Sequence, residues 1–151
     1  MDLELVAAVE GFIQKNGKQQ LLTLLNAPSS NFDVEVLTII CNTGLHPLQS
    51  LHKRGEVFSA STGSLDFSTE EASVGTLTYI LERVAEKLRQ RSWKIVCIVP
   101  FGLAVLSMHI KALVYRVLNI DTIEVLHAGG GAHFDIQIDI RNVALAGRSN
   151  S

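Results

Sequence analysis

The residues of this chain that could do chemistry lie in turns that follow apolar runs. An Asn-Thr-Gly turn, a Pro-Phe-Gly turn and a His-Ala-Gly-Gly-Gly loop each follow such a run, and an adjacent basic pair lies in a loop after the first. Backbone amides at the start of a helix attract anions, and the Pro-Phe-Gly turn precedes a predicted helix. Together these groups suit an anionic, nucleotide-like ligand. The candidate ligand-binding residues are Asn42, Thr43, Gly44, Lys53, Arg54, Pro100, Phe101, Gly102, His127 and Gly129.

The sequence contains no recognised motif for a metal ion, a nucleotide cofactor or a catalytic nucleophile. The five histidines lie in different predicted elements without metal-ligand spacing. The glycines at 129–131 are not followed by Lys-Ser/Thr and precede a strand, so they fit neither a phosphate-binding P-loop nor a dinucleotide fingerprint. A hairpin loop and a phosphate-contacting loop both remain open for them. Neither Ser61 nor Ser64 lies in a nucleophile elbow.

The helices and strands that must position these turns are predicted to form an α/β fold. Apolar, β-branched runs at 34–42, 95–99 and 122–126 predict buried parallel strands, and 57–62 predicts a short edge strand. Amphipathic spacing predicts helices over 68–91, with a capping box at Ser68–Glu71, and over 102–119. We expect a three-layer, Rossmann-like, mostly parallel sheet. The carboxyl ends of parallel strands share one edge, so the candidate turns should converge there.

The end of the chain predicts an antiparallel hairpin. Residues 133–141 (HFDIQIDIR) alternate apolar and polar side chains, as a half-exposed strand does. This strand should pair with 122–126 through the glycine loop. The domain prediction is a helical N-terminal appendage over 1–27, an α/β body over 28–145, and a disordered tail over 146–151, with the breaker cluster Ala27–Asn31 at the boundary.

The helix predicted over 102–119 is apolar on nearly all sides. Leu106, Ile110 and Val114 lie on one face, while Met108 and Tyr115 lie on the other. A helix of this kind is covered on both sides. The second cover is either the N-terminal helices or another chain, and we expect a homo-oligomer or an effector protein to contact it.

The composition of the chain limits the kinds of partner and the compartment that we expect. A net charge of −2 gives no electrostatic case for duplex DNA. Both cysteines, Cys41 and Cys97, lie in apolar runs and are expected to be buried, reduced thiols. The acidic start of the chain is unlike a signal peptide, and the apolar run 95–110 is shorter than the roughly 20 residues of a membrane span. We therefore expect a cytoplasmic protein that does not enter a membrane.

The order of these elements resembles a known family. The succession VEVLTIICNTG, TLTYILERVAEKL, KIVCIVP, FGLAVLSMHIKAL and DTIEVLHAG is similar to a single Rossmann-like repeat of the SAVED and CARF (CRISPR-associated Rossmann fold) domains, best over Leu77–Asp139 and extending back to Val34. The resemblance implies a sensor of cyclic oligonucleotides in bacterial antiviral defence, with Thr43-Gly44, Phe101-Gly102 and the His127 loop facing the ligand. SAVED domains fuse two repeats and carry an effector, whereas this chain has room for one repeat.

Three functional hypotheses follow. The first is a non-enzymatic sensor or regulatory module that binds a nucleotide second messenger and assembles. The second is a protein-interaction subunit without a small ligand, and the third is a small nucleotide-processing hydrolase that uses His127 or His133.

Overall fold

The computed structural model describes residues 3–26, 35–44 and 46–150, and it divides the chain into the units Met1–Asn31 and Phe32–Ser151. The first unit contains helices α1 (Leu3–Asn16) and α2 (Lys18–Asn26). Gly17 separates them with a φ of 83°, and its N–H donates to the Ile13 carbonyl over 2.8 Å. This is the left-handed helix end that only glycine adopts at little cost. The boundary predicted at residues 27–28 lies outside the described residues.

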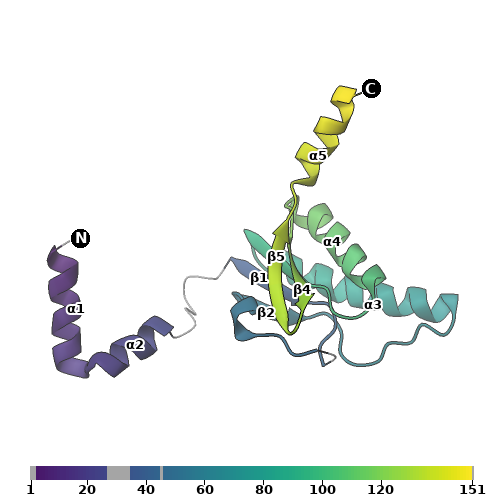
Figure 1. Ribbon diagram of the computed structural model, residues 1–151. Helices are drawn as coiled ribbons and strands as arrows, with labels where there is room; N and C mark the ends of the chain where they lie inside the picture. The colour runs from purple at the N-terminus through teal and green to yellow at the C-terminus, as the bar shows by residue number, and fades with distance from the viewer. Residues whose placement is uncertain (1–2, 27–34, 45, 151) are drawn as a thin grey trace. The chain divides into compact units, whose positions relative to one another are not determined.

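The second unit is built on a five-stranded sheet (Figure 1). In space the order of the strands is β2-β1-β3-β4-β5. The first four are parallel, while β4 and β5 form an antiparallel hairpin, so the α/β class, the mostly parallel Rossmann-like sheet and the hairpin are all confirmed. The strands are β1 (Val36–Ile40), β2 (Glu56–Ser59), β3 (Ile95–Val99), β4 (Ile123–Gly129) and β5 (Ala132–Gln137).

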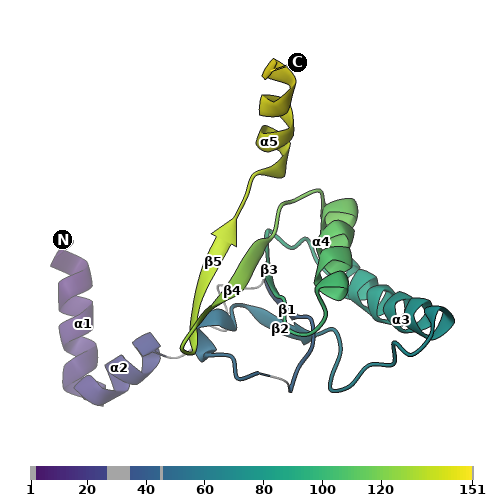
Figure 2. The same cartoon turned by 45° about the vertical axis from the view of Figure 1, so that its right-hand side comes forward.

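Helices α3 (Glu70–Arg89) and α4 (Ala104–Leu118) lie side by side on one face of the sheet (Figure 2). Every second residue of the buried strands points toward them, because side chains alternate across a sheet. The resulting core is fully apolar. It contains Leu37, Ile39, Val96 and Ile98 from the strands and Ile80, Val84, Leu88, Leu106, Ile110 and Val114 from the helices.

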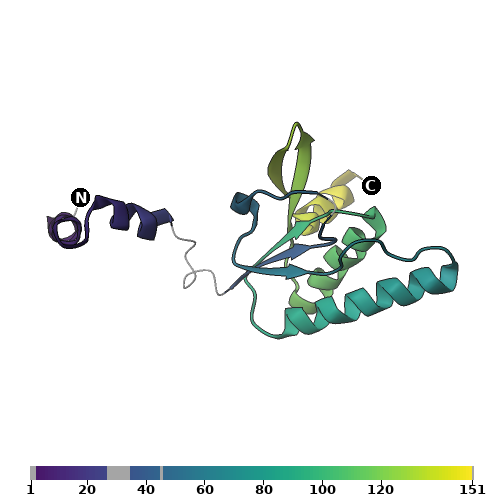
Figure 3. The same ribbon diagram turned by 90° about the horizontal axis from the view of Figure 1, so that it is seen from below.

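The opposite face of the sheet is covered by a loop segment rather than by a helix of this unit. The chain moves from β1 to β2 in one direction along the sheet, then from β2 to β3 and from β3 to β4 in the other. Parallel crossovers are right-handed, so the first connection must lie on the face opposite α3 and α4. Figure 3 shows the 3₁₀ turn Ser50–His52 of this connection and α3 on opposite sides of the strands. The expected third layer is therefore this short connection.

Two contacts fasten this connection to the sheet. The Thr38 hydroxyl donates to the Arg54 carbonyl over 2.6 Å, and the Arg54 N–H reaches the same hydroxyl oxygen over 3.1 Å. Leu48 packs on a small cluster formed by Ile40, Val99 and Val125 together with Phe101. The connection thus lies flat on the sheet although it forms only one turn of helix.

The bounds of the elements differ from those predicted, and the contacts explain the differences at α3 and at the end of the chain. The N-cap of α3 is Thr69, whose hydroxyl accepts from Ala72 N–H over 3.1 Å, while Ser68 bonds to Asp66 instead. The strand predicted over 133–141 ends at Gln137, because the Asp139 carboxylate accepts from Asn142 N–H over 2.9 Å and starts a helix. That helix is α5 (Ile140–Ala146), and the 3₁₀ turn Gly147–Asn150 follows it where a disordered tail was predicted.

Candidate functional site

The path of the chain across the sheet reverses its direction at the neighbouring strands β1 and β3. The chain leaves β1 toward β2 and leaves β3 toward β4, on opposite sides of this pair. Ile40 and Val99 are partners in register, so the segments that follow them emerge side by side. The two connections then diverge onto opposite faces of the sheet, and a crevice opens beyond the strand ends. Parallel α/β sheets bind their ligands at this position.

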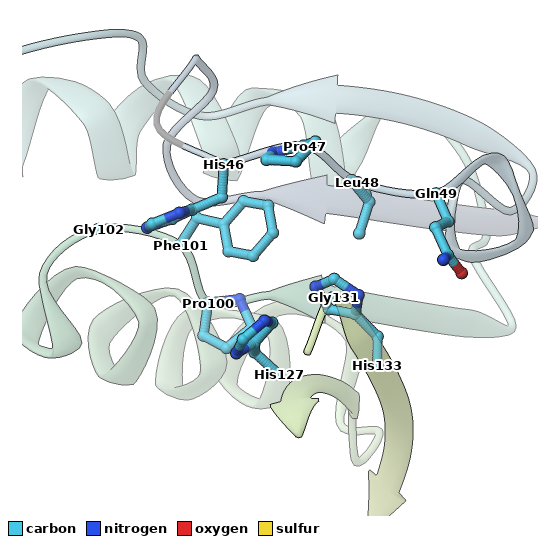
Figure 4. A pocket seen from close by; sticks show the side chains of 10 residues that line it. All are labelled: His46, Pro47, Leu48, Gln49, Pro100, Phe101, Gly102, His127, Gly131 and His133. Atoms are coloured by element: carbon cyan, nitrogen blue, oxygen red, sulfur yellow. The ribbon is translucent and has the colours of Figure 1, made fainter. Parts of the chain in front are cut away.

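A pocket of about 670 Å³ lies beyond these strand ends (Figure 4). Its volume falls within the range of about 300–1,000 Å³ that small-molecule sites occupy. Three segments build it: the start of the β1–β2 connection, the turn after β3, and the tip of the β4–β5 hairpin. The lining residues are His46, Pro47, Leu48, Gln49, Pro100, Phe101, Gly102, His127, Gly131 and His133.

Aromatic and imidazole rings form the walls of the pocket. The Phe101 ring centroid lies 5.3 Å from that of His46 and 6.0 Å from that of His133. His127 and His133 lie 5.1 Å apart in an edge arrangement. Among the described residues that line the pocket, none carries a permanent charge. Such walls suit a flat, polarisable group better than an isolated ion.

His133 is the most unusual of these side chains. Both of its ring nitrogens are inaccessible to solvent, and neither has a hydrogen-bond partner in the described part of the chain. A buried polar atom without a partner is unfavourable by about 1–3 kcal/mol. Since solvent does not reach these nitrogens, a ligand would bond to them only if the surrounding side chains moved.

A charged cluster lies behind the pocket, next to His133. Its ring lies 5.4 Å from the buried ring of His52, whose Nδ1 is 3.8 Å from a carboxylate oxygen of Asp135. Arg54 donates to the same carboxylate with both terminal nitrogens, over 2.7 and 3.1 Å. A bidentate pair of this kind is directional, so it holds the β4–β5 hairpin against the β1–β2 connection.

Four of the predicted site residues line the pocket: Pro100, Phe101, Gly102 and His127. The other six are not among its lining residues. Arg54 is engaged by Asp135, Lys53 is exposed, and Gly129 is the last residue of β4, where it pairs with Ala132. The basic pair, predicted to meet an anion, is therefore not placed at the pocket wall.

The Asn42-Thr43-Gly44 turn has a structural role beside the pocket. Asn42 donates through its side-chain amide to the Gly63 carbonyl over 2.9 Å, and Thr43 forms an isolated parallel bridge with Thr62. Gly102, with a φ of 90°, passes so close to Asn42 that an added Cβ would lie 3.1 Å from the Asn42 Cβ. The turn thus supports the backbone at Gly102, just before α4 begins.

The first turn of α4 presents backbone amides next to Gly102. Its N-cap is Leu103, whose side chain has no hydrogen-bonding group, and the turn from Ala104 to Ser107 has no acidic residue. The positive end of the helix dipole is therefore not neutralised within its own segment. In combination with the ring-lined pocket, this end of α4 can receive the anionic part of a ligand.

The ligand-binding residues predicted from the sequence did not include His46, Pro47, Leu48, Gln49, Gly131 and His133, although His133 was named in the hydrolase hypothesis and Gly131 in the glycine loop. His133 could have been found, since an antiparallel hairpin turning at the glycines pairs it with His127, and the structure has this pair in register. All three glycines, 129–131, have positive φ, as a tight turn requires. The connection residues carry no such signal, because their place depends on how the loop folds onto the sheet.

The two cysteines are structural. Both are free and buried. Burial raises the pKa of the Cys41 thiol to about 12, and burial is also the main reason that the pKa of the Cys97 thiol is raised. Because only the thiolate is strongly nucleophilic, neither group is prepared to attack a substrate.

No family model, curated protein or solved structure matches this chain. The sheet therefore defines the fold class of this protein. It is a Rossmann-like α/β fold with a ring-lined pocket where the strand order reverses. Within the described residues, no helix is long and apolar enough to cross a membrane, and no group of three or more His, Cys, Asp or Glu side chains is arranged to hold a metal ion.

Proposed function

We propose that this protein is a non-enzymatic sensor or regulatory module that binds a nucleotide second messenger in the pocket beyond β1 and β3. One observation carries the proposal: Phe101 and the imidazoles of His46, His127 and His133 meet at the place where parallel sheets bind ligands. The SAVED/CARF resemblance narrows the messenger to a cyclic oligonucleotide and the setting to bacterial antiviral defence. Both refinements rest on that resemblance alone.

The pocket offers separate partners for the two parts of a nucleotide. A base can stack on Phe101, where base–aromatic stacking is worth about 1–3 kcal/mol. The edge of the base would lie against the imidazole rings of His127 and His133. The phosphate lies toward Gly102 and the amides of the first turn of α4. The volume of about 670 Å³ is large enough for at least one nucleotide unit.

Assembly is the second half of the proposal. The outward face of α4 exposes Val105, Met108 and Tyr115, with 68% of Met108 accessible to solvent. Large exposed apolar patches on soluble proteins mark contact surfaces. The same observation supports the alternative that the protein is an interaction subunit without a small ligand, and a ligand screen separates the two.

Ligand binding predicts a higher melting temperature, because a ligand that binds only the folded state stabilises it. At a concentration of one hundred times Kd the gain is about 2.7 kcal/mol. For a chain of this size that gain raises Tm by roughly 5–10 °C. The measurement is differential scanning fluorimetry with linear and cyclic oligoadenylates and related cyclic dinucleotides.

Two variants sharpen the screen. His127→Ala removes an exposed ring from the pocket wall and should reduce the Tm shift, whereas His109→Ala removes an exposed histidine of α4 outside the pocket and should leave it unchanged. Chromatography of the messenger after incubation tests for turnover, which the sensor reading excludes and the hydrolase reading requires. Absence of a Tm shift across the whole panel would refute the ligand half of the proposal.

A further inference from the structure

Helix α5 is the element of the second unit whose presence the fold does not explain. It has seven residues, and every one of them is exposed. Val143 and Leu145 are accessible over 60% and 53% of their surfaces. Isolated helices shorter than about 12 residues are marginal in water, so most helices are held by packing of an apolar face. Among the described residues of the second unit, α5 lacks such packing.

A groove beside α5 offers a matching apolar surface. It has a volume of about 510 Å³ and lies between the outward face of α4 and the segment that leads into β4. Ile140, the first residue of α5, forms part of its wall. The other lining residues are Met108, Lys111, Ala112, Tyr115, Arg116, Ile120, Asp121 and Thr122. Ile140 thus places the start of α5 next to the exposed apolar side chains of α4.

Hydrogen bonds anchor the start of α5 beside this groove. The Arg141 guanidinium donates to Tyr115 Oη over 3.4 Å and to Asn119 Oδ1 over 3.3 Å, at the C-terminal end of α4. Asp139 caps the helix through Asn142. From this anchor α5 extends away from α4 in the views of Figures 1 and 2, and Val143 and Leu145 are not among the residues that line the groove.

We infer that two copies of this chain form a two-fold symmetric dimer in which α5 of each copy docks into the α4 groove of the other. Each copy supplies a helix that needs cover and a groove that needs an occupant, so one symmetric contact satisfies both at once. Such an isologous contact closes on itself and does not propagate into a filament. A net charge of only −2 per chain gives little repulsion between copies. The dimer deepens the assembly half of the proposed function and is independent of ligand binding.

Sedimentation equilibrium in the absence of ligand tests the dimer across a wide dilution series. The wild-type protein should have twice the chain mass of 16.5 kDa at the higher concentrations. Val143→Asp with Leu145→Asp, and separately Met108→Asp, should raise the dimer dissociation constant at least about tenfold, as changes at central contact residues do. All three residues are exposed, so the monomer should stay folded by circular dichroism. Val74→Asp, at an exposed position on α3, is the matched control and should remain a dimer.

Cross-linking identifies the occupant of the groove. One chain carries Met108→Cys, a second carries Val143→Cys, and the two are mixed under mild oxidation; the native cysteines are buried. A covalent heterodimer supports the exchange of α5. A third chain carries both substitutions. If a disulfide forms within this chain but none forms between the two single variants, α5 folds back on its own groove, and the inference is overturned. A monomeric wild type, or a dimer that survives the α5 and groove variants, would also overturn it, while the separately measured messenger binding would remain unaffected.

Discussion

Gly55→Ala is expected to destabilise the protein by about 3–5 kcal/mol. The new methyl group would overlap a neighbouring atom, and the backbone would hold a side chain at an unfavourable positive φ. Gly55 has a φ of 61°, a conformation that disfavours any side chain. An added Cβ would lie 2.1 Å from the carbonyl oxygen of Val36, far inside contact distance. This is the point where the β1–β2 connection rejoins the sheet, so relieving the overlap would lift the connection off β1 and disturb the pocket wall.

The matched control is Gly63→Ala. Gly63 has a similar φ of 69°, but an added Cβ meets nothing within 4 Å. Only the backbone term remains there, and the expected loss is about 1–2 kcal/mol. Chemical denaturation followed by circular dichroism measures both free energies of unfolding. Equal losses in the two variants would show that the close approach of Gly55 to Val36 is not maintained in solution.

Phe101→Ala is expected to lose both stability and ligand binding. The ring is 8% exposed and packs with Ile40, Val99 and Val125 beneath the pocket. Truncation of a buried phenylalanine typically destabilises a protein by about 3–5 kcal/mol. The same ring is the proposed stacking surface, so the variant should also lose the thermal shift with any messenger that the wild type binds.

Two further variants separate packing from recognition. Phe101→Leu keeps most of the volume and should cost less than about 1.5 kcal/mol of stability, but it removes the aromatic face and should weaken messenger binding roughly tenfold or more. Phe134→Ala, at a half-exposed position on β5, should change both quantities little. Isothermal titration calorimetry gives the affinities. Full affinity in Phe101→Leu would remove base stacking from the account.

Local sequence patterns were sufficient to predict the sheet. Continuous β-branched runs identified β1 and β3, and the glycine run with the alternating residues after it identified the β4–β5 hairpin. The convergence of the β3 turn and His127 at one sheet edge followed from these strands, because parallel strands end at a common edge. These features depend on residues close together in the sequence.

The features that were missed depend on contacts between distant segments. His46 reaches the pocket only because the β1–β2 connection lies flat on the sheet, and Arg54 is removed from the site by Asp135, 81 positions away in the sequence. The alternation that predicted a strand over 133–141 gave no sign that the Asp139 carboxylate would cap a helix there. Periodicity describes one element at a time, and these contacts join several.

The central claim, that the pocket beyond β1 and β3 binds a nucleotide messenger, is tested most directly by the histidine ring resonances. In heteronuclear NMR the five histidines are natural probes: His46, His127 and His133 line the pocket, His52 lies behind it, and His109 lies on α4 outside it. Titration with a cyclic oligoadenylate should shift the three pocket resonances together, with a smaller change at His52 and none at His109. Saturating messenger that leaves the three pocket resonances unmoved, or that moves His109 alone, would contradict the account.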